Sequence, residues 1–196
     1  MRLVHSRASS LGNLNFMKTM DPVFVGYFPF RPDPVPDGLH LPGVEVICSV
    51  SHCIAEVPGN WIDHWTHNDL GFYDTRSAAR EVARADGGVF EIFGYRVFPV
   101  RISDSVVEHF DVPVSPAEDL GGFVLLGIDL VTRSAGSFFE CSPLSCNGGA
   151  EEFRVNDCCL IEDLTYALDA GVRMEKSNYE PGPYHLVEVW RTQCKA

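Results

Sequence analysis

The stretch FEIFGYRVFPVRI, residues 90–102, decides the fold of this chain of 196 residues. It is rich in aromatic and β-branched residues and is bounded by turn signals, which together predict a β-strand. Gly94 and Pro99 mark bends within it. The segment FVLLGIDLVT, residues 123–132, carries apolar residues on both faces. It predicts a second strand, buried inside a sheet.

Weaker sequence patterns predict further strands for this sheet and helices that pack against it. Residues 23–29 and 184–191 predict strands, and residues 44–57 predict a strand or a bent strand pair. Helices are expected at 60–68, at 75–85, and at 157–170 after an Asn156 N-cap. We therefore predict an α+β domain, with mixed α/β as the alternative, in which about three helices pack on a mixed or antiparallel sheet of about five to seven strands.

The composition restricts the classes of partner. Hydrophobic residues make up 45% and charged residues 21% of the chain, as in soluble globular proteins. The longest apolar runs are only a few residues, so the sequence predicts no membrane span. The 15 basic and 27 acidic residues give a net charge of −12. We expect no nucleic-acid partner, because a phosphate backbone is bound mainly through Lys and Arg.

The two ends of the chain differ in composition. Residues 1–20 contain no acidic residue and are expected to form a flexible extension, followed by a single globular domain at 21–196. No stretch resembles a signal peptide, and seven cysteines, an odd number, suit free thiols in a reducing compartment. Twelve of the 15 basic residues are Arg, which fits a GC-rich bacterial genome. The expectation is a cytoplasmic bacterial protein.

The densest group of polar and aromatic residues is WIDHWTHN, residues 61–68. On a helix, Trp61, His64, Trp65 and Asn68 share one face. This composition predicts His64 as a general base, and the two tryptophans and Asn68 as ligand contacts. The alternative is an amphipathic helix that the tryptophans anchor to the sheet.

The loop ECSPLSCNGGA, residues 140–150, is the most unusual local sequence. A thiol and hydroxyls beside a flexible glycine pair are what a nucleophile with an oxyanion pocket needs. Ser145 and Cys146 are therefore candidate catalytic residues, and Asn147 is a candidate ligand contact. The alternative is a tight loop whose side chains satisfy local backbone groups.

Two acidic residues, Asp129 and Glu188, interrupt strongly apolar strands. A buried carboxylate without a partner is costly, so each is predicted to be paired or to lie at a cleft as a catalytic acid. Arg96, on an apolar strand face, is a candidate ligand contact or the ionic partner of either acid. An interior ion pair is the structural alternative.

The cysteines offer a third candidate, a metal site. Cys48 with Cys53, and Cys141 with Cys146, form two C-x₄-C pairs. Side chains five residues apart on a strand point to opposite faces, which disfavours chelation by the first pair. We predict no metal and no cofactor. Adjacent Cys158 and Cys159 are expected to pack at the start of the helix after Asn156.

Motifs for nucleotide, dinucleotide, zincin and α/β-hydrolase sites are absent from the sequence. The leading hypothesis is therefore an acidic binding or regulatory domain that engages a basic protein partner, as immunity and antitoxin proteins do. The alternative is a hydrolase or transferase with a pocket built from the segments 140–150 and 61–68. A zinc-stabilised domain is the second alternative. Convergence of His64, Cys146 and either strand acid would favour the enzyme.

Overall fold

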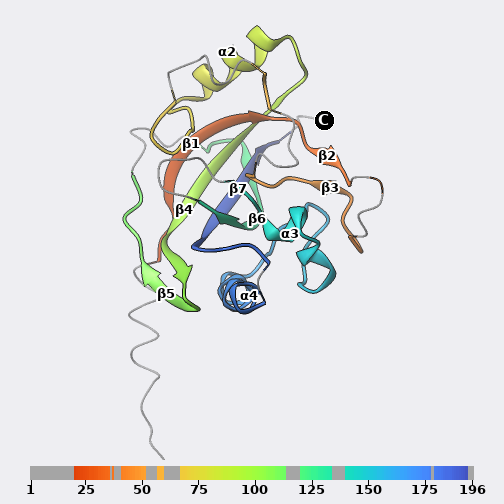
Figure 1. Cartoon of the computed structure of the whole chain (residues 1–196). Helices are drawn as coiled ribbons and strands as arrows, with labels where there is room; N and C mark the ends of the chain where they lie inside the picture. Colours follow the sequence, from red (N-terminus) through yellow and green to blue (C-terminus); the bar gives the residue numbers. More distant parts are fainter. Residues whose placement is uncertain are drawn as a thin grey trace, which may run out of the picture.

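Strand β4, Glu91–Ser103, is the longest strand and organises the sheet, because it pairs with three others. The computed structural model describes residues 20–35, 37, 41–51, 57–59, 67–113, 120–133, 140–177 and 179–193. In that part of the chain the main sheet has five antiparallel strands (Figure 1). The order is β1 (Val23–Phe30), β4, β7 (Tyr184–Thr192) and β6 (Phe123–Thr132), with β5 (Val106–His109) paired to β4.

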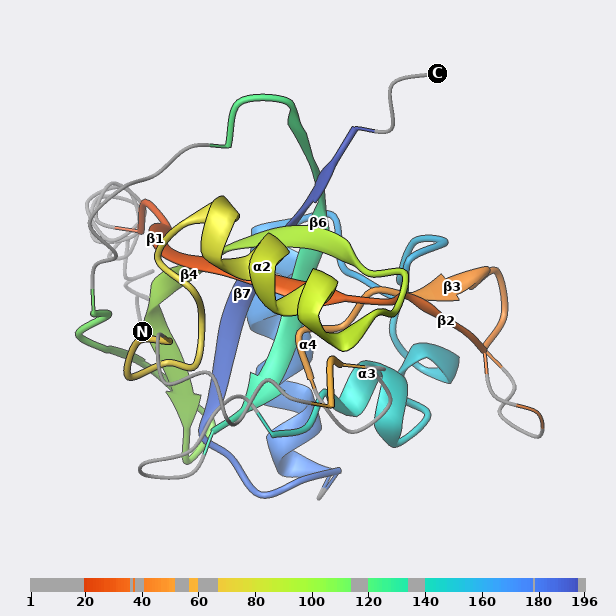
Figure 2. The same ribbon diagram turned by 90° about the horizontal axis from the view of Figure 1, so that it is seen from above.

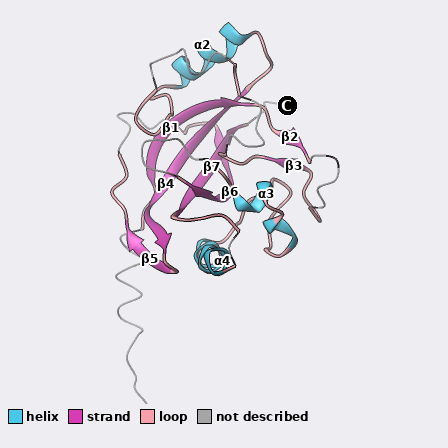
Figure 3. Cartoon of the chain, in the orientation of Figure 1, coloured by secondary structure: helices cyan, strands magenta, loops and turns pink. Residues whose placement is uncertain are grey.

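The helices lie on both sides of this sheet. Helix α2, Arg76–Asp86, packs on β1, and helix α4, Leu164–Lys176, packs on the opposite side (Figures 1 and 2). Short helix α3, Pro143–Cys146, lies beside β6, and the 3-10 turn η2, Gly149–Glu151, packs on α3. A separate two-stranded ribbon pairs β2, Asp33–Pro34, with β3, Val46–Ile47 (Figure 3). The prediction of an α+β fold with an antiparallel sheet is confirmed.

Two hydrophobic cores result from this layering. Leu130 and Leu186 belong to the core beneath α4, whereas Val131 and Val187 belong to the core on the α2 side. Since side chains alternate along a strand, the middle strands are buried on both faces. None of the described helices has the length and apolarity needed to cross a membrane.

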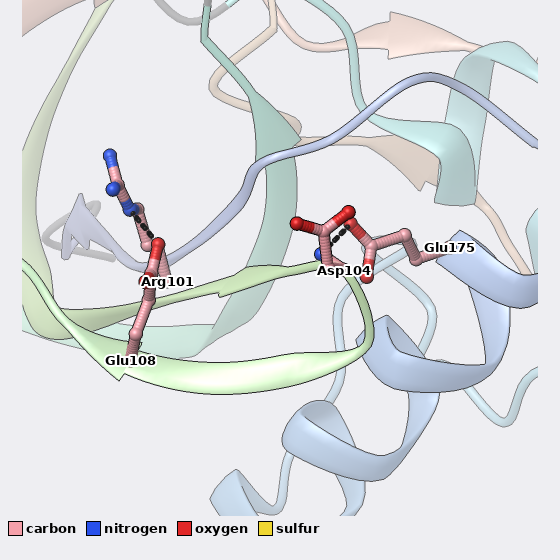
Figure 4. Close-up of polar contacts among 4 residues, drawn as sticks. All are labelled: Arg101, Asp104, Glu108 and Glu175. Carbon is pink, nitrogen blue, oxygen red and sulfur yellow. Dashed lines mark hydrogen bonds and ion pairs between the residues drawn. The ribbon is translucent and has the colours of Figure 1, made fainter.

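The β4–β5 hairpin is fastened to α4. Asp104 and Ser105 form its turn with positive φ angles, and their backbone amides donate hydrogen bonds to the Glu175 carboxylate (Figure 4). Nε of Arg101 donates across the hairpin to Glu108 at 2.6 Å. Glu175 thereby accepts the hydrogen bonds of two turn amides that have no acceptor within the hairpin.

The predicted helix at 157–170 begins too early. Helix α4 starts at Leu164, and its N-cap is Asp163, which accepts from the Tyr166 amide. Asn156 caps a loop instead, because its side-chain oxygen accepts from the amides of Cys158 and Leu160. Cys158 and Cys159 therefore do not lie at a helix N-terminus, which corrects that expectation.

Residues 60–66 of the helix predicted at 60–68 lie outside the described residues. Its last two residues, His67 and Asn68, are not helical, so the prediction is wrong there. His67 bridges to Tyr73 in extended form. The Asn68 side chain closes a turn: its nitrogen donates to Val25 O, and its oxygen accepts from backbone amides two and four residues later. The strand predicted at 44–57 reduces to Val46–Ile47 in the described part.

A glycine in β1, Gly26, allows a neighbouring segment to approach the sheet closely. At Gly26, φ is +134°, and an added Cβ would lie 2.7 Å from both Phe72 Cβ and Tyr73 O. Tyr73 and Tyr27 exchange backbone hydrogen bonds of 2.8 Å at this point. The absence of a side chain at Gly26 therefore lets the segment before α2 come close enough to pair with Tyr27 of β1.

We expect Gly26→Ala to lower the free energy of unfolding by about 2–3 kcal/mol, because backbone must move to admit the methyl group. Gly43→Ala is the matched control, since Gly43 also has a positive φ but its added Cβ meets nothing within 4 Å. The control should lose only about 1 kcal/mol. Urea unfolding measures both values, and equal losses would contradict the close-approach argument.

Candidate functional site

A buried carboxylate lies at the centre of the site. Asp129, on β6, has no exposed surface. Its oxygens accept hydrogen bonds from Ser49 Oγ at 2.6 Å, Ser142 Oγ at 2.6 Å and the Val50 amide at 2.9 Å. Burial raises the pKa of the Asp129 carboxyl to about 6, although the three hydrogen bonds oppose this shift. Asp129 therefore joins β6 to two distant segments of the chain.

The segment after β3 continues this network toward a thiol. Ser49 Oγ accepts from the Ser51 amide at 3.0 Å, and Ser51 Oγ donates to the Glu140 carbonyl at 2.9 Å. Ser51 Oγ also lies 3.8 Å from Cys146 Sγ. Ser51 is thus positioned, through Ser49, to contact the sulfur of Cys146.

Helix α3 holds the other side of the thiol. Ser142 is its N-cap, Pro143 fills the first turn, and the Cys146 amide donates to the Ser142 carbonyl at 2.8 Å. Ser145 is fully buried, and its hydroxyl lies 3.9 Å from Cys146 Sγ. Because Ser142 also donates to Asp129, the same carboxylate fixes both walls around Cys146.

Cys146 is the thiol of this arrangement whose pKa is lowered. A side-chain hydrogen bond with Cys141 is the largest cause that lowers the pKa of Cys146, from an ordinary 9.0 to about 6. Burial opposes this shift, whereas contacts with Ser142, Ser51 and Ser145 support it. At neutral pH the sulfur is therefore mostly thiolate, the form that acts as a nucleophile.

Cys146 lines a cavity of about 710 Å³. Asn147 fixes part of its edge, because its side-chain nitrogen donates to the Tyr179 carbonyl at 2.9 Å and to Glu180 at 2.8 Å. Cys141 Sγ lies 3.8 Å from the same Glu180 carboxylate. The volume suits a small-molecule or side-chain substrate. The lining residues are Cys146, Asn147, Gly148, Glu151, Glu152, Ser177 and Tyr179.

The other described cysteines differ from Cys146. Cys48 and Cys158 hydrogen-bond to each other, which raises the pKa of Cys48 and lowers that of Cys158. Both are buried, at 0% and 8% exposure, and neither lines a described cavity. Burial raises the pKa of Cys159 to about 12. Among Cys48, Cys146, Cys158 and Cys159, Cys146 alone combines a lowered pKa with a place in the lining of a cavity.

The structure brings together four predicted site residues: Asp129, Ser145, Cys146 and Asn147. Glu188 lies apart, since it pairs in register with Ile128 and so projects from the sheet face opposite to Asp129. Arg96 Nη1 lies 3.9 Å from Glu188, so the predicted ion pair forms with Glu188. The other predicted residues do not join this group: Asn68 closes its turn, and Trp61, His64 and Trp65 lie outside the described residues.

The sequence did not connect Ser49 and Ser51 with this site. It presented Cys141 only as a possible metal ligand, and Ser142 only as part of the loop 140–150. Each stands in or beside a C-x₄-C pair, but hydrogen bonds such as that between Ser49 and Asp129 span 80 residues, which no local pattern reveals. Across the described ranges, no group of three or more His, Cys, Asp or Glu residues could hold a metal ion. Comparison of the chain with family models, curated proteins and solved structures gives no match.

We expect Asp129→Asn to change the pH dependence of stability. The folded-state pKa of about 6 lies above the ordinary 3.8, so the folded state holds the proton more tightly than the unfolded state. Wild-type stability relative to the variant should therefore fall as pH rises from about 4 to 6, by up to about 3 kcal/mol, and then level off.

Asn is a suitable replacement because its oxygen can accept from Ser49 and Val50, while its nitrogen donates to Ser142. Chemical unfolding of both proteins between pH 4 and 8 measures the difference. A difference that does not vary with pH would contradict the raised pKa.

Proposed function

We propose that this protein is a thiol-dependent enzyme of disulfide exchange, with Cys146 as the attacking thiolate and Cys141 as the resolving thiol. One observation carries the proposal: Cys146, whose pKa is lowered to about 6 by the Cys141 thiol, lines a cavity. The two cysteines stand five residues apart: Cys141 precedes the N-cap of α3, and Cys146 is the last residue of this helix. This assignment develops the enzyme hypothesis based on the loop 140–150.

The chemistry needs only the two thiols and a disulfide substrate. The Cys146 thiolate attacks one sulfur of the substrate, forms a mixed disulfide and releases the other sulfur as a thiolate. The Cys141 thiol gives its proton to that thiolate and attacks the Cys146 sulfur. The second substrate sulfur then leaves, and Cys141 and Cys146 are joined. Two electrons pass to the substrate, which departs as one thiol and one thiolate that takes its proton from water, and an external dithiol returns the enzyme to its reduced form.

Disulfide exchange fits the described lining better than acyl transfer does. A hydrolase or transferase needs a group that protonates its leaving atom, and a histidine most often serves. The described lining of the Cys146 cavity contains no histidine. A thiol with a pKa near ambient pH is already suited to disulfide exchange without a separate base.

We expect alkylation of Cys146 by iodoacetamide to rise with pH around a midpoint of about 6. Cys141→Ala should move this midpoint upward, toward the ordinary thiol value of 9.0, because it removes the main hydrogen bond to the thiolate. Cys141→Ser keeps a donor and should retain a lower midpoint. Mass spectrometry of the peptide that contains Cys146 gives the rates. A wild-type midpoint near 9 would refute the assignment.

Turnover provides the second measurement. Cys146→Ser should abolish reduction of cystamine by the protein, whereas Cys141→Ser should accumulate a mixed disulfide on Cys146. Cys159→Ser is the matched control, since this buried thiol should not react. Unchanged reduction by the Cys146→Ser variant would exclude the mechanism.

The acidic surface supports a second proposal, binding of a basic protein partner. The chain carries a net charge of −12, and exposed Glu151 and Glu152 line the Cys146 cavity. Negative charge at this rim favours the approach of a cationic segment. If the protein only binds a basic partner, as the immunity-like hypothesis states, binding should survive Cys146→Ser. If the basic partner is instead the substrate of Cys146, it should carry the disulfide.

We expect the rim charge to select between small disulfides. The variant with both Glu151→Lys and Glu152→Lys should react roughly fivefold more slowly with dicationic cystamine and faster with anionic oxidised glutathione. Glu81→Lys with Glu162→Lys is the control, since both residues are exposed, neither lines the cavity, and the net charge changes equally. Equal effects of the two double variants would show that only overall charge matters.

A further inference from the structure

A second cavity, of about 880 Å³, follows one face of α2. Three arginines of this helix line it, Arg76, Arg80 and Arg84, together with the turn at Gly121 and Gly122. It shares no lining residue with the Cys146 cavity. In a chain with 15 basic residues and a net charge of −12, this is a local concentration of positive charge.

The spacing of the arginines places them in a row. Residues four apart lie one above the next on a helix, where like charges repel. Arg80 and Arg84 are exposed, and neither guanidinium forms an ion pair or a hydrogen bond with the described residues. In the described part of the chain, Arg80 and Arg84 are therefore neighbouring cations without a counterion. Their repulsion lowers the stability of the helix unless an anion from outside binds there.

Arg76 gives the groove a fixed base. Its Nη2 donates to the Gly121 carbonyl at 3.0 Å, and its guanidinium lies 4.3 Å from the centre of the Phe123 ring. The Arg76 Nε is buried and has no hydrogen-bond partner among the described residues. Arg76 thus holds the turn at Gly121 against α2, and Arg80 and Arg84 are left to meet a ligand.

The acid on the wall of the groove is already neutralised. Glu91 lines the cavity, but it accepts two hydrogen bonds from Arg191, at 2.6 Å and 2.8 Å. This bidentate pair cancels its charge, so Glu91 does not compensate the free arginines. The groove consequently remains cationic.

An apolar wall adjoins the arginines. Val89 is 83% exposed and Phe90 is half-buried, and both line the cavity. Gly88 and Gly122 add no side-chain bulk next to them. A ligand that fits both parts has an anionic group for the guanidinium forks and a flat apolar group for this wall.

We infer that this groove binds a phosphate ester of nucleotide size, with its phosphates on Arg80 and Arg84 and its base against Val89 and Phe90. Guanidinium groups bind phosphate through paired hydrogen bonds, and the volume lies within the range of small-molecule sites. A small ester fits better than a nucleic-acid strand, because a protein of net charge −12 repels an extended phosphate backbone. This site is independent of the thiol chemistry.

The test is titration calorimetry of the full chain with ADP, inorganic pyrophosphate and adenosine. We expect ADP to bind, pyrophosphate to bind more weakly, and uncharged adenosine not to saturate. The double variant Arg80→Ala with Arg84→Ala should weaken ADP binding by at least about tenfold, since it removes the charged contacts. Arg154→Ala with Arg173→Ala is the matched control, because both arginines are exposed and neither lines the groove.

Thermal unfolding of both double variants shows that they remain folded, as expected for exposed side chains. The proposal is overturned if neither ADP nor pyrophosphate saturates the wild type below about 10 mM. It is also overturned if the two double variants bind ADP alike, or if adenosine binds as tightly as ADP. Each of these outcomes is independent of the state of Cys146.

Discussion

The hydrogen bonds to the buried carboxylate of Asp129 are the interaction on which the thiol site depends. A carboxylate in the interior is costly, and its three donors offset that cost. The donors come from the segment after β3 and from the cap of α3, which are otherwise short and irregular. The hydrogen bonds to Asp129 therefore hold these two segments in place beside Cys146. Elsewhere in the fold, the backbone hydrogen bonds of longer strands and helices do this.

The same carboxylate also limits the charge of the site. Asp129 and Cys146 are both acids, and negative charge on Cys146 raises the pKa of Asp129. Each group titrates near pH 6, so ionisation of either one makes ionisation of the other less favourable. Hydroxyl and thiol donors around Cys146 oppose this repulsion. The surroundings of the sulfur therefore favour a thiolate in spite of the buried acid behind it.

The sequence predicts those features of the molecule that depend on residues close together in the chain. Segment 123–132 was predicted in full and β4 nearly so, because the apolar pattern is local. The start of α4 was missed since Asn156 can cap a loop as well as a helix, and the positive φ of Cys159 prevents a helix there. The loop 140–150 was a candidate site because of its composition. Its partners Ser49 and Ser51 were not, because only the fold brings them to it.

Net charge alone describes the surface of this protein poorly. The value of −12 governs long-range attraction and repulsion, but screening limits such forces to about 8–10 Å at physiological salt. Within that distance, Glu151 and Glu152 face the Cys146 cavity, whereas Arg80 and Arg84 face another one. An acidic protein can therefore hold a cationic groove, provided that the acidic residues on its wall are paired with other cations. Glu91, for example, pairs with Arg191 and so does not neutralise the arginines of the groove. Local pairing, and not total charge, decides which ions each cavity can accept.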